Sequence, residues 1–269
     1  MVQVYMWDEK ENYTFEYLVK IMQLLRSDNG CPWDKEQTHQ SIRNNLLEEV
    51  YETVDAIDRL DDKDMVEELG DLLLQVVFHC QIASERSAFD IDKVADGICK
   101  KLIYRHPHIF SNVVANTSEE VLNNWDNLKN KEKNMNSFSD TLYAVPKAFP
   151  ACIRAQKIQK RAGKAGYDFK TLNDTVVKLE EEVAELKAAI ALGDLDAAAA
   201  ELGDVIFSSV NTARHLSVDA EEQLDRSTER FISRFASAED IANAEGKSLA
   251  DYDDKELDII WQKAKQSLK

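Results

Sequence analysis

Apolar residues recur every three or four positions along most of the chain, which is the spacing of amphipathic α-helices. The stretch LLEEVYE (46–52) is typical, with Leu46 and Val50 on one side of a helix and three glutamates beside them. No segment shows a convincing alternation with the period of a β-strand. In the first half, the pattern predicts helices over about 13–27, 38–60, 63–86, 91–104 and 117–133. We therefore expect an all-α fold.

The second half of the chain repeats the first at an offset of 133 residues. LEEVYE (47–52) recurs as EEEVAE (180–185), and EELGDLLLQVV (67–77) recurs as AELGDVIFSSV (200–210). Each copy carries, in the same order, an aromatic–Asp pair, E-E-x-x-E, E-x-G-D, a basic pair four residues apart and W-x-x-x-K. These shared elements predict two tandem repeats of a helical domain of about 120 residues.

A polar stretch followed by two prolines separates the two copies. We therefore expect an N-terminal domain over residues 1–130, a linker over 131–146 and a C-terminal domain over 147–269. The second domain should follow the same helical plan as the first from about residue 147.

Carboxylates gather on two helix faces of the first copy. Glu48, Glu49 and Glu52 occupy an arc beside the apolar face of their helix. Glu68 and Asp71 lie on one stripe of a helix that is apolar nearly all round, which predicts that this helix is buried. A buried ionised carboxylate is costly unless it is paired, so if the two stripes face each other, mutual repulsion would raise the pKa values of the carboxylates unless cations neutralise them.

The second copy has acids at the matching positions, namely Glu181, Glu182, Glu185, Glu201 and Asp204. Gly70 and Gly203 stand between the acids of the second motif, where a small residue should allow close helix approach. Taken alone, E-E-x-x-E indicates a solvated helix face, and E-x-G-D indicates carboxylates paired with Lys or Arg. Recurrence of both motifs at identical spacing favours a cage of oxygen ligands for hard divalent cations.

A basic pair and a tryptophan follow the acids in each copy. The basic pairs are Lys101 with Arg105 and Arg230 with Arg234. Such residues could bind phosphates, and guanidinium groups suit bidentate phosphate contacts. Trp125 and Trp261 could stack on a base or close a pocket. The plain alternatives are a solvated surface for the basic pairs and core packing for the tryptophans, but repetition in register favours a binding role.

The net charge of −17 argues against a nucleic-acid coat and against a basic membrane-binding patch. An anionic substrate would need a metal cation to offset the protein's own field. The four cysteines form no C-x-x-C pair, which indicates free thiols in a reducing cytosol. The first residues lack a signal-peptide pattern and the longest apolar stretch is too short to cross a bilayer. We therefore expect a cytoplasmic protein without nucleic-acid or membrane partners.

These motifs together resemble those of the MazG nucleoside triphosphate pyrophosphohydrolases. The resemblance rests on GCPWDKEQT (30–38), the paired acidic motifs, RHPHIF (105–110), QKIQKRAGKAGYDF (156–169) and the tandem arrangement. It implies hydrolysis of nucleoside triphosphates to monophosphate and pyrophosphate, with broad base and sugar tolerance, in nucleotide-pool house-cleaning. It also implies helical domains that form four-helix bundles in a homodimer, with Mg²⁺ held by the acidic motifs and Mn²⁺ as a substitute.

The resemblance assigns roles to residues of both copies. The implied metal ligands are Glu182, Glu185, Glu201 and Asp204, with Glu49, Glu52, Glu68 and Asp71 in the first copy. The implied nucleotide contacts are Lys178, Arg230, Arg234, Trp261 and Lys265, with Lys101, Arg105, Trp125 and Lys129 in the first copy. Glu181 and Glu48 are the candidates for orienting or deprotonating the attacking water. Both acid sets are intact, and the arginine pair favours the second copy.

Two other classes of protein stay open. A non-catalytic helical scaffold could use the acidic stripes as structural ion sites while it senses a nucleotide or binds a partner. A carboxylate-bridged redox metal protein would want two E-x-x-H motifs, and Glu36 with His39 forms one that the second copy does not repeat.

Overall fold

The computed structural model describes residues 12–115, 117–132, 135 and 137–267. Every regular element in these residues is a helix, so the predicted all-α fold is confirmed. The chain divides into two compact units, Met1–Lys129 and Asn130–Lys269. Within the described ranges, no helix is both long enough and apolar enough to cross a membrane.

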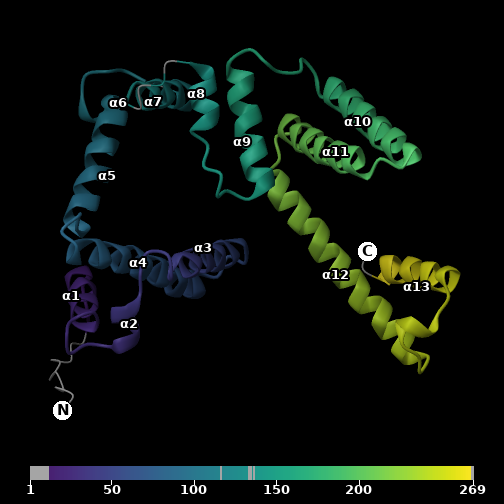
Figure 1. The fold of residues 1–269 in the computed structure, drawn as a ribbon, viewed down its shortest axis with the longest axis horizontal. Helices are drawn as coiled ribbons and strands as arrows, with labels where there is room; N and C mark the ends of the chain where they lie inside the picture. The colour runs from purple at the N-terminus through teal and green to yellow at the C-terminus, as the bar shows by residue number, and fades with distance from the viewer. Residues whose placement is uncertain (1–11, 116, 133–134, 136, 268–269) are drawn as a thin grey trace. The chain divides into compact units, whose positions relative to one another are not determined.

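The first unit is built on an antiparallel hairpin of two helices (Figure 1). Its helices are α1 (Phe15–Leu25), α2 (Pro32–Glu36), α3 (Arg43–Asp58), α4 (Asp62–Glu85), α5 (Ile91–Arg105), α6 (Pro107–Phe110) and α7 (Ser118–Glu132), which ends just beyond the unit. The hairpin consists of α3 and α4, and α1 and α5 also pack on α4. Met22 of α1 and Val77 and Phe78 of α4 form the core of the unit with Ile42 and Ile82.

The second unit contains two helical hairpins (Figure 1). Its elements are α8 (Phe138–Tyr143), α9 (Ala151–Lys164), α10 (Leu172–Leu192), α11 (Leu195–His215), α12 (Ala220–Ala244), the 3₁₀ turn η1 (Leu249–Asp251) and α13 (Asp254–Ser267). One hairpin pairs α10 with α11, and the other pairs α12 with α13 around the buried Ala238, Ile260 and Ala264. Helix α9 packs on α11 and α12. Helix α8, which lies in the stretch expected to be a linker, packs on α9.

Tight turns join the helices of the two acidic hairpins. Between α3 and α4, Leu60 has φ 55° and Asp61 caps α4 by accepting hydrogen bonds from two backbone N–H groups. Between α10 and α11, Gly193 has φ 72° and the Asp194 side chain caps α11. The same left-handed turn is therefore built on leucine in the first unit and on glycine in the second.

Large apolar side chains stay exposed on the acidic hairpins. On α4, Leu69 is 48 % exposed and Leu73 is 40 % exposed, and Ile206 of α11 is 51 % exposed. The prediction that the α4 helix is buried all round is wrong for the single chain, because its packing partners α1, α3 and α5 leave one face open. The predicted close helix approach at Gly70 and Gly203 is also absent, since a Cβ on either glycine would meet no atom within 4 Å.

Candidate functional site

Three acids of the first unit converge where α3 and α4 face each other. Glu49 of α3 and Glu68 and Asp71 of α4 each offer one carboxylate oxygen, and these oxygens all lie within 4.8 Å of one another. We call these three residues the first acidic group. All three side chains are partly buried, and Gln75, one helical turn beyond Asp71, donates from Nε2 to Glu49 Oε1 at 3.3 Å.

Burial and, after it, neighbouring negative charges raise the pKa values of two carboxyl groups here. Burial raises the pKa of the Glu49 carboxyl above its ordinary value, and the charges of Asp71 and Glu52 raise it further. Burial also raises the pKa of Glu68, with the Glu52 charge as the next cause. The Glu52 carboxylate is thus close enough to raise the pKa values of Glu49 and Glu68, although none of its oxygens belongs to the three that converge. A bound cation would relieve this repulsion.

The second unit repeats the convergence between α10 and α11. One oxygen each of Glu182, Glu201 and Asp204 lies within 4.8 Å of the other two, and we call these residues the second acidic group. Glu182 is buried, at 8 % exposure. Burial raises the pKa of Glu201, and the charge of the neighbouring Glu185 raises it further. The helical periodicity therefore brought together three of the four expected ligands in each copy, with Glu52 and Glu185 beside them.

A lysine joins the second acidic group. Lys178 Nζ lies 3.0 Å from Glu182 Oε1 and 3.2 Å from Glu181 Oε2. The hydrogen bond to Glu182, followed by that to Glu181, raises the pKa of Lys178 well above its ordinary value. Glu48, the counterpart of Glu181, is exposed on the first unit. The sequence assigned Lys178 to the nucleotide, and its contact with the carboxylates was not foreseen.

The basic and aromatic residues have different settings in the two units. Arg105 is buried at 5 % exposure, with its guanidinium carbon 5.2 Å from the centroid of the Trp125 ring. Arg230 is exposed and donates from Nη2 to Ser227 Oγ at 2.5 Å, while Trp261 packs against Phe231 with ring centroids 5.4 Å apart. Lys101 is exposed, and Arg234, Lys129 and Lys265 are half-buried.

The second unit does not bring these residues onto its acidic group. Arg230, Arg234, Trp261 and Lys265 lie on the α12–α13 hairpin, and α12 packs mainly on α13 and α9. Among the described side chains, no bond joins this hairpin to Glu182, Glu201 or Asp204. In the first unit, Arg105 is directed at Trp125. The acids are therefore assembled within each unit, and the expected phosphate contacts are presented elsewhere.

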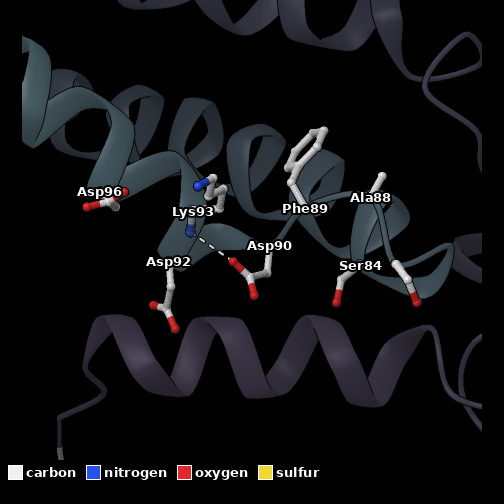
Figure 2. A pocket seen from close by; sticks show the side chains of 8 residues that line it. Ser84, Ala88, Phe89, Asp90, Asp92, Lys93 and Asp96 are labelled. Carbon is white, nitrogen blue, oxygen red and sulfur yellow. Dashed lines mark hydrogen bonds between the residues drawn. The ribbon is translucent and has the colours of Figure 1, made fainter.

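A hollow of about 620 Å³ lies at the junction of α4 and α5, and its lining includes no residue of either acidic group (Figure 2). It is lined by Ser84, Ser87, Ala88, Phe89, Asp90, Asp92, Lys93 and Asp96. Asp90 caps α5 by accepting from the Lys93 backbone N–H at 2.8 Å, and Asp96 pairs with Lys100. These acids support the helix itself, and none of the residues expected to bind metal or nucleotide lies there.

Gln75 is the residue of the first site to which sequence reasoning assigned no role. It is 6 % exposed, its Nε2 holds Glu49, and its Oε1 is buried without a hydrogen-bond partner in the described structure. Its place on the Glu68–Asp71 stripe was the available signal. The donor set around it consists of carboxylate and amide oxygens, which fits a hard divalent cation such as Mg²⁺.

The tandem helical hairpins, each with a group of converging carboxylates, define an all-α protein with two candidate sites for a divalent cation. The model of the MazG nucleotide pyrophosphohydrolase domain matches residues 37–110 and 170–237, one segment in each unit. The nucleoside triphosphate pyrophosphohydrolase of Escherichia coli (strain K12) is 43 % identical over 252 residues, which cover 93 % of this chain and 96 % of that protein.

Two further relatives agree with this match. The nucleoside triphosphate pyrophosphohydrolase/pyrophosphatase MazG of Thermotoga maritima is 42 % identical over 251 residues, 93 % of this chain and 95 % of that protein. A nucleoside triphosphate pyrophosphohydrolase of Mycobacterium tuberculosis is 39 % identical over 163 residues, 60 % of this chain and 48 % of that protein. The chain belongs to the MazG nucleotide pyrophosphohydrolase family, and it is an enzyme of that family.

Proposed function

We propose that this enzyme hydrolyses nucleoside triphosphates to nucleoside monophosphates and pyrophosphate with Mg²⁺ bound at its acidic groups. The observation that carries the proposal is the convergence of Glu182, Glu201 and Asp204 within 4.8 Å. The names of the relatives support the reaction, and the all-oxygen donor set supports Mg²⁺, with Mn²⁺ as a substitute. The proposal includes broad base and sugar tolerance and a house-cleaning role.

The residues of the second unit suit hydrolysis by an activated water. Glu182, Glu185, Glu201 and Asp204 would hold Mg²⁺, which when bound shields phosphate charge and lowers the pKa of a coordinated water. Glu181 would orient the water or accept its proton, as would Glu48 in the first unit. Arg230 and Arg234 would stabilise charge on the pyrophosphate, and Trp261 would stack on the base. Lys265 and, once freed from its carboxylates, Lys178 would also contact phosphate.

We propose that the active form is a homodimer. The open apolar faces of α4 and α11 carry Leu69, Leu73 and Ile206, and such faces are unfavourable in water. A second copy that packs on them would complete four-helix bundles and would supply arginine side chains, which neither acidic group contacts within the described part of its own unit. Light scattering should give twice the chain mass of 30.6 kDa. A monomer that retains full turnover would remove this part of the proposal.

Three further parts of the proposal concern the domain limits, the cellular compartment and the partners of the protein. We propose that the domain limits are 1–130 and 147–269 with the linker 131–146. The thiols of Cys31, Cys80, Cys99 and Cys152 are free, which fits a reducing compartment such as the cytoplasm. The strong negative charge supports a protein without nucleic-acid or membrane partners.

The test measures the product of hydrolysis and its dependence on each acidic group. Wild-type protein with Mg²⁺ should release pyrophosphate, not orthophosphate, and chelation should abolish the release. Glu201→Ala should reduce turnover by about 10²-fold or more if the second unit carries most of it, and Glu68→Ala should then have the smaller effect. Normal turnover in the double variant would refute the proposal, and nucleotide binding without hydrolysis would favour the sensing scaffold.

A further inference from the structure

The two acidic groups hold equivalent acids but differ in the residues that compensate them. At the offset of 133, Lys178 occupies the position of Asn45, and Ser208 occupies the position of Gln75. The second group therefore has an ammonium group 3.0 Å from its buried glutamate, whereas the first has the neutral amide of Gln75 at 3.3 Å. Among the described residues, the second acidic group therefore contacts a positively charged side chain, and the first contacts a neutral amide in its place.

We infer that Lys178 is an internal counter-ion that makes the second acidic group bind a free divalent cation more weakly than the first. The inference rests on the proposed function, because it concerns the Mg²⁺ that the reaction would use. A cation that enters the second group must displace Lys178 from Glu182 or tolerate its charge. The Lys178 side chain is 38 % exposed, so water screens part of this effect.

Lys178 is also able to leave. Its side chain is a flexible four-carbon stem that ends in a compact charge, and its half-exposed position allows it to turn outward. Triphosphate bound beside the second group would offer Lys178 a stronger partner than the carboxylates. Cation and nucleotide should therefore favour each other's binding in the second unit, while the first unit should take up the cation alone.

The first group has the features of a site that accepts a free cation. Gln75 holds Glu49 without adding charge, and its buried Oε1 has no partner in the described structure. This oxygen could accept a hydrogen bond from a water on the cation or contact the cation itself. The position of Lys178 is taken by Asn45, which carries no charge.

The experiment is a titration of the full-length protein with Mn²⁺, in which the electron paramagnetic resonance signal reports the free ion. Asp71→Asn in the first group leaves the second site to be measured, and Asp204→Asn leaves the first. In the Asp71→Asn background, adding Lys178→Asn should tighten Mn²⁺ binding about tenfold. In the Asp204→Asn background, adding Asn45→Lys should weaken it about tenfold.

Matched variants separate charge from side-chain loss. Lys178→Arg keeps the charge and should leave Mn²⁺ affinity close to that of its parent. Lys187→Asn removes a lysine from the same helix, and should change affinity less than about twofold because surface charges at a distance are screened. Circular dichroism melts will confirm that each variant is folded. With a non-hydrolysable α,β-methylene triphosphate present, wild-type affinity for Mn²⁺ at the second site should rise more than that of Lys178→Asn.

Unchanged or weaker Mn²⁺ binding in folded Lys178→Asn would overturn the inference, as would equal affinities of the two wild-type sites. These outcomes are independent of turnover. If the wild-type protein releases pyrophosphate but Lys178→Asn does not alter Mn²⁺ binding, the counter-ion role alone is refuted. If Mn²⁺ binding changes as stated but no triphosphate is hydrolysed, the proposed function is refuted and the counter-ion role stands.

Discussion

The two basic pairs have the same spacing in sequence, but their second members have different surroundings in the structure. Arg105 is the last residue of α5 and lies buried over Trp125, whereas its counterpart Arg234 lies within α12 and is half-buried. Pro107 prevents α5 from continuing, and the chain turns into α6 with the His106 ring edge-on to Trp125 at 4.9 Å. A repeated motif therefore gives a repeated site only where the following turn of the chain also repeats.

Lys101 and Arg230, the first members of the two pairs, are both exposed. The largest expected effect is on the kcat/KM of variants that lack one or the other. Arg230→Ala should lower kcat/KM for pyrophosphate release by about 10²-fold, because a guanidinium available to phosphate is removed from the unit favoured for turnover. Lys101→Ala, at the matching position of the first unit, should lower it less than about threefold. Steady-state kinetics with one nucleoside triphosphate and saturating Mg²⁺ will compare the two.

Arg226→Ala is the matched control for this pair of variants. Arg226 lies on the same helix and is exposed, but it pairs with Glu222 at 2.5 Å. Its loss should leave kcat/KM nearly unchanged. Equal effects of Lys101→Ala and Arg230→Ala would mean that the two units contribute equally to turnover.

Each unit has a carboxylate–arginine pair near its acidic hairpin. The two pairs can be compared through the loss of stability of each unit at low pH. In the second unit, Arg214 Nη1 donates to Asp168 Oδ2 at 2.9 Å, and Nη2 donates to Oδ1. In the first, Arg26 donates from both Nε and Nη2 to Glu85 at 2.7 Å. Hydrogen bonds from the arginine hold the pKa of Asp168, and likewise of Glu85, below the ordinary value.

A lowered pKa means that the folded state binds fewer protons than the unfolded state near the ordinary value. The stabilisation is therefore present above that pH and is lost as pH falls towards the lowered pKa. Asp168→Asn should cost about 2 kcal/mol at neutral pH and much less in acid, because the partly buried Arg214 loses its counter-charge. Hydrogen exchange of α9 and α11 at several pH values will measure this, and a pH-independent loss would contradict it.

For the free energy of unfolding, we expect the larger loss in the first unit, whereas for catalysis we expect it in the second. Arg105→Ala should destabilise the first unit by about 2 kcal/mol, because it removes a buried stem and a guanidinium stacked on Trp125. Arg230→Ala should alter the free energy of unfolding of the second unit by less than about 0.5 kcal/mol. Hydrogen exchange of α5 and α12 measures the stability of the two units separately. Equal losses of stability in the two variants would contradict this prediction.

Helix type and the acidic groups could be predicted because both depend on local periodicity. The helix expected over 63–86 is observed at Asp62–Glu85, and the spacing of Glu68 and Asp71 sets their common stripe. The helix expected over 38–60 begins only at Arg43. Thr38 and Ser41 bond to each other's backbone N–H groups there, which offers the chain an alternative to a helical start.

Features that depend on distant segments were not available from periodicity. The spacing of Lys101 and Arg105 does not reveal that Trp125 covers the arginine, because that contact is set by the turn at Pro107. The apolar surround of α4 predicted a buried helix, but the single chain leaves Leu69 and Leu73 exposed. The pairing of Lys178 with Glu182 is different, because the two residues lie four apart on α10 and helical spacing alone allows their contact.

The smallest expected effect concerns the turn that joins each acidic hairpin. Leu60 adopts φ 55° and is 88 % exposed, whereas its counterpart Gly193 adopts φ 72° without a side chain. Leu60→Gly should stabilise the first unit by about 0.5–1 kcal/mol, since relief of the left-handed strain exceeds the added entropy of the unfolded chain. Gly193→Ala should destabilise the second unit by about 1 kcal/mol.

Leu60→Ala separates strain from the loss of an exposed side chain. Alanine keeps the Cβ that makes the left-handed conformation costly, so this variant should show little of the gain expected for glycine. Chemical denaturation monitored by hydrogen exchange in α3 and α4 will distinguish the two substitutions. If alanine stabilises the hairpin as much as glycine does, the exposed leucine side chain is the source of the cost, and the two turns differ in solvation instead of backbone strain.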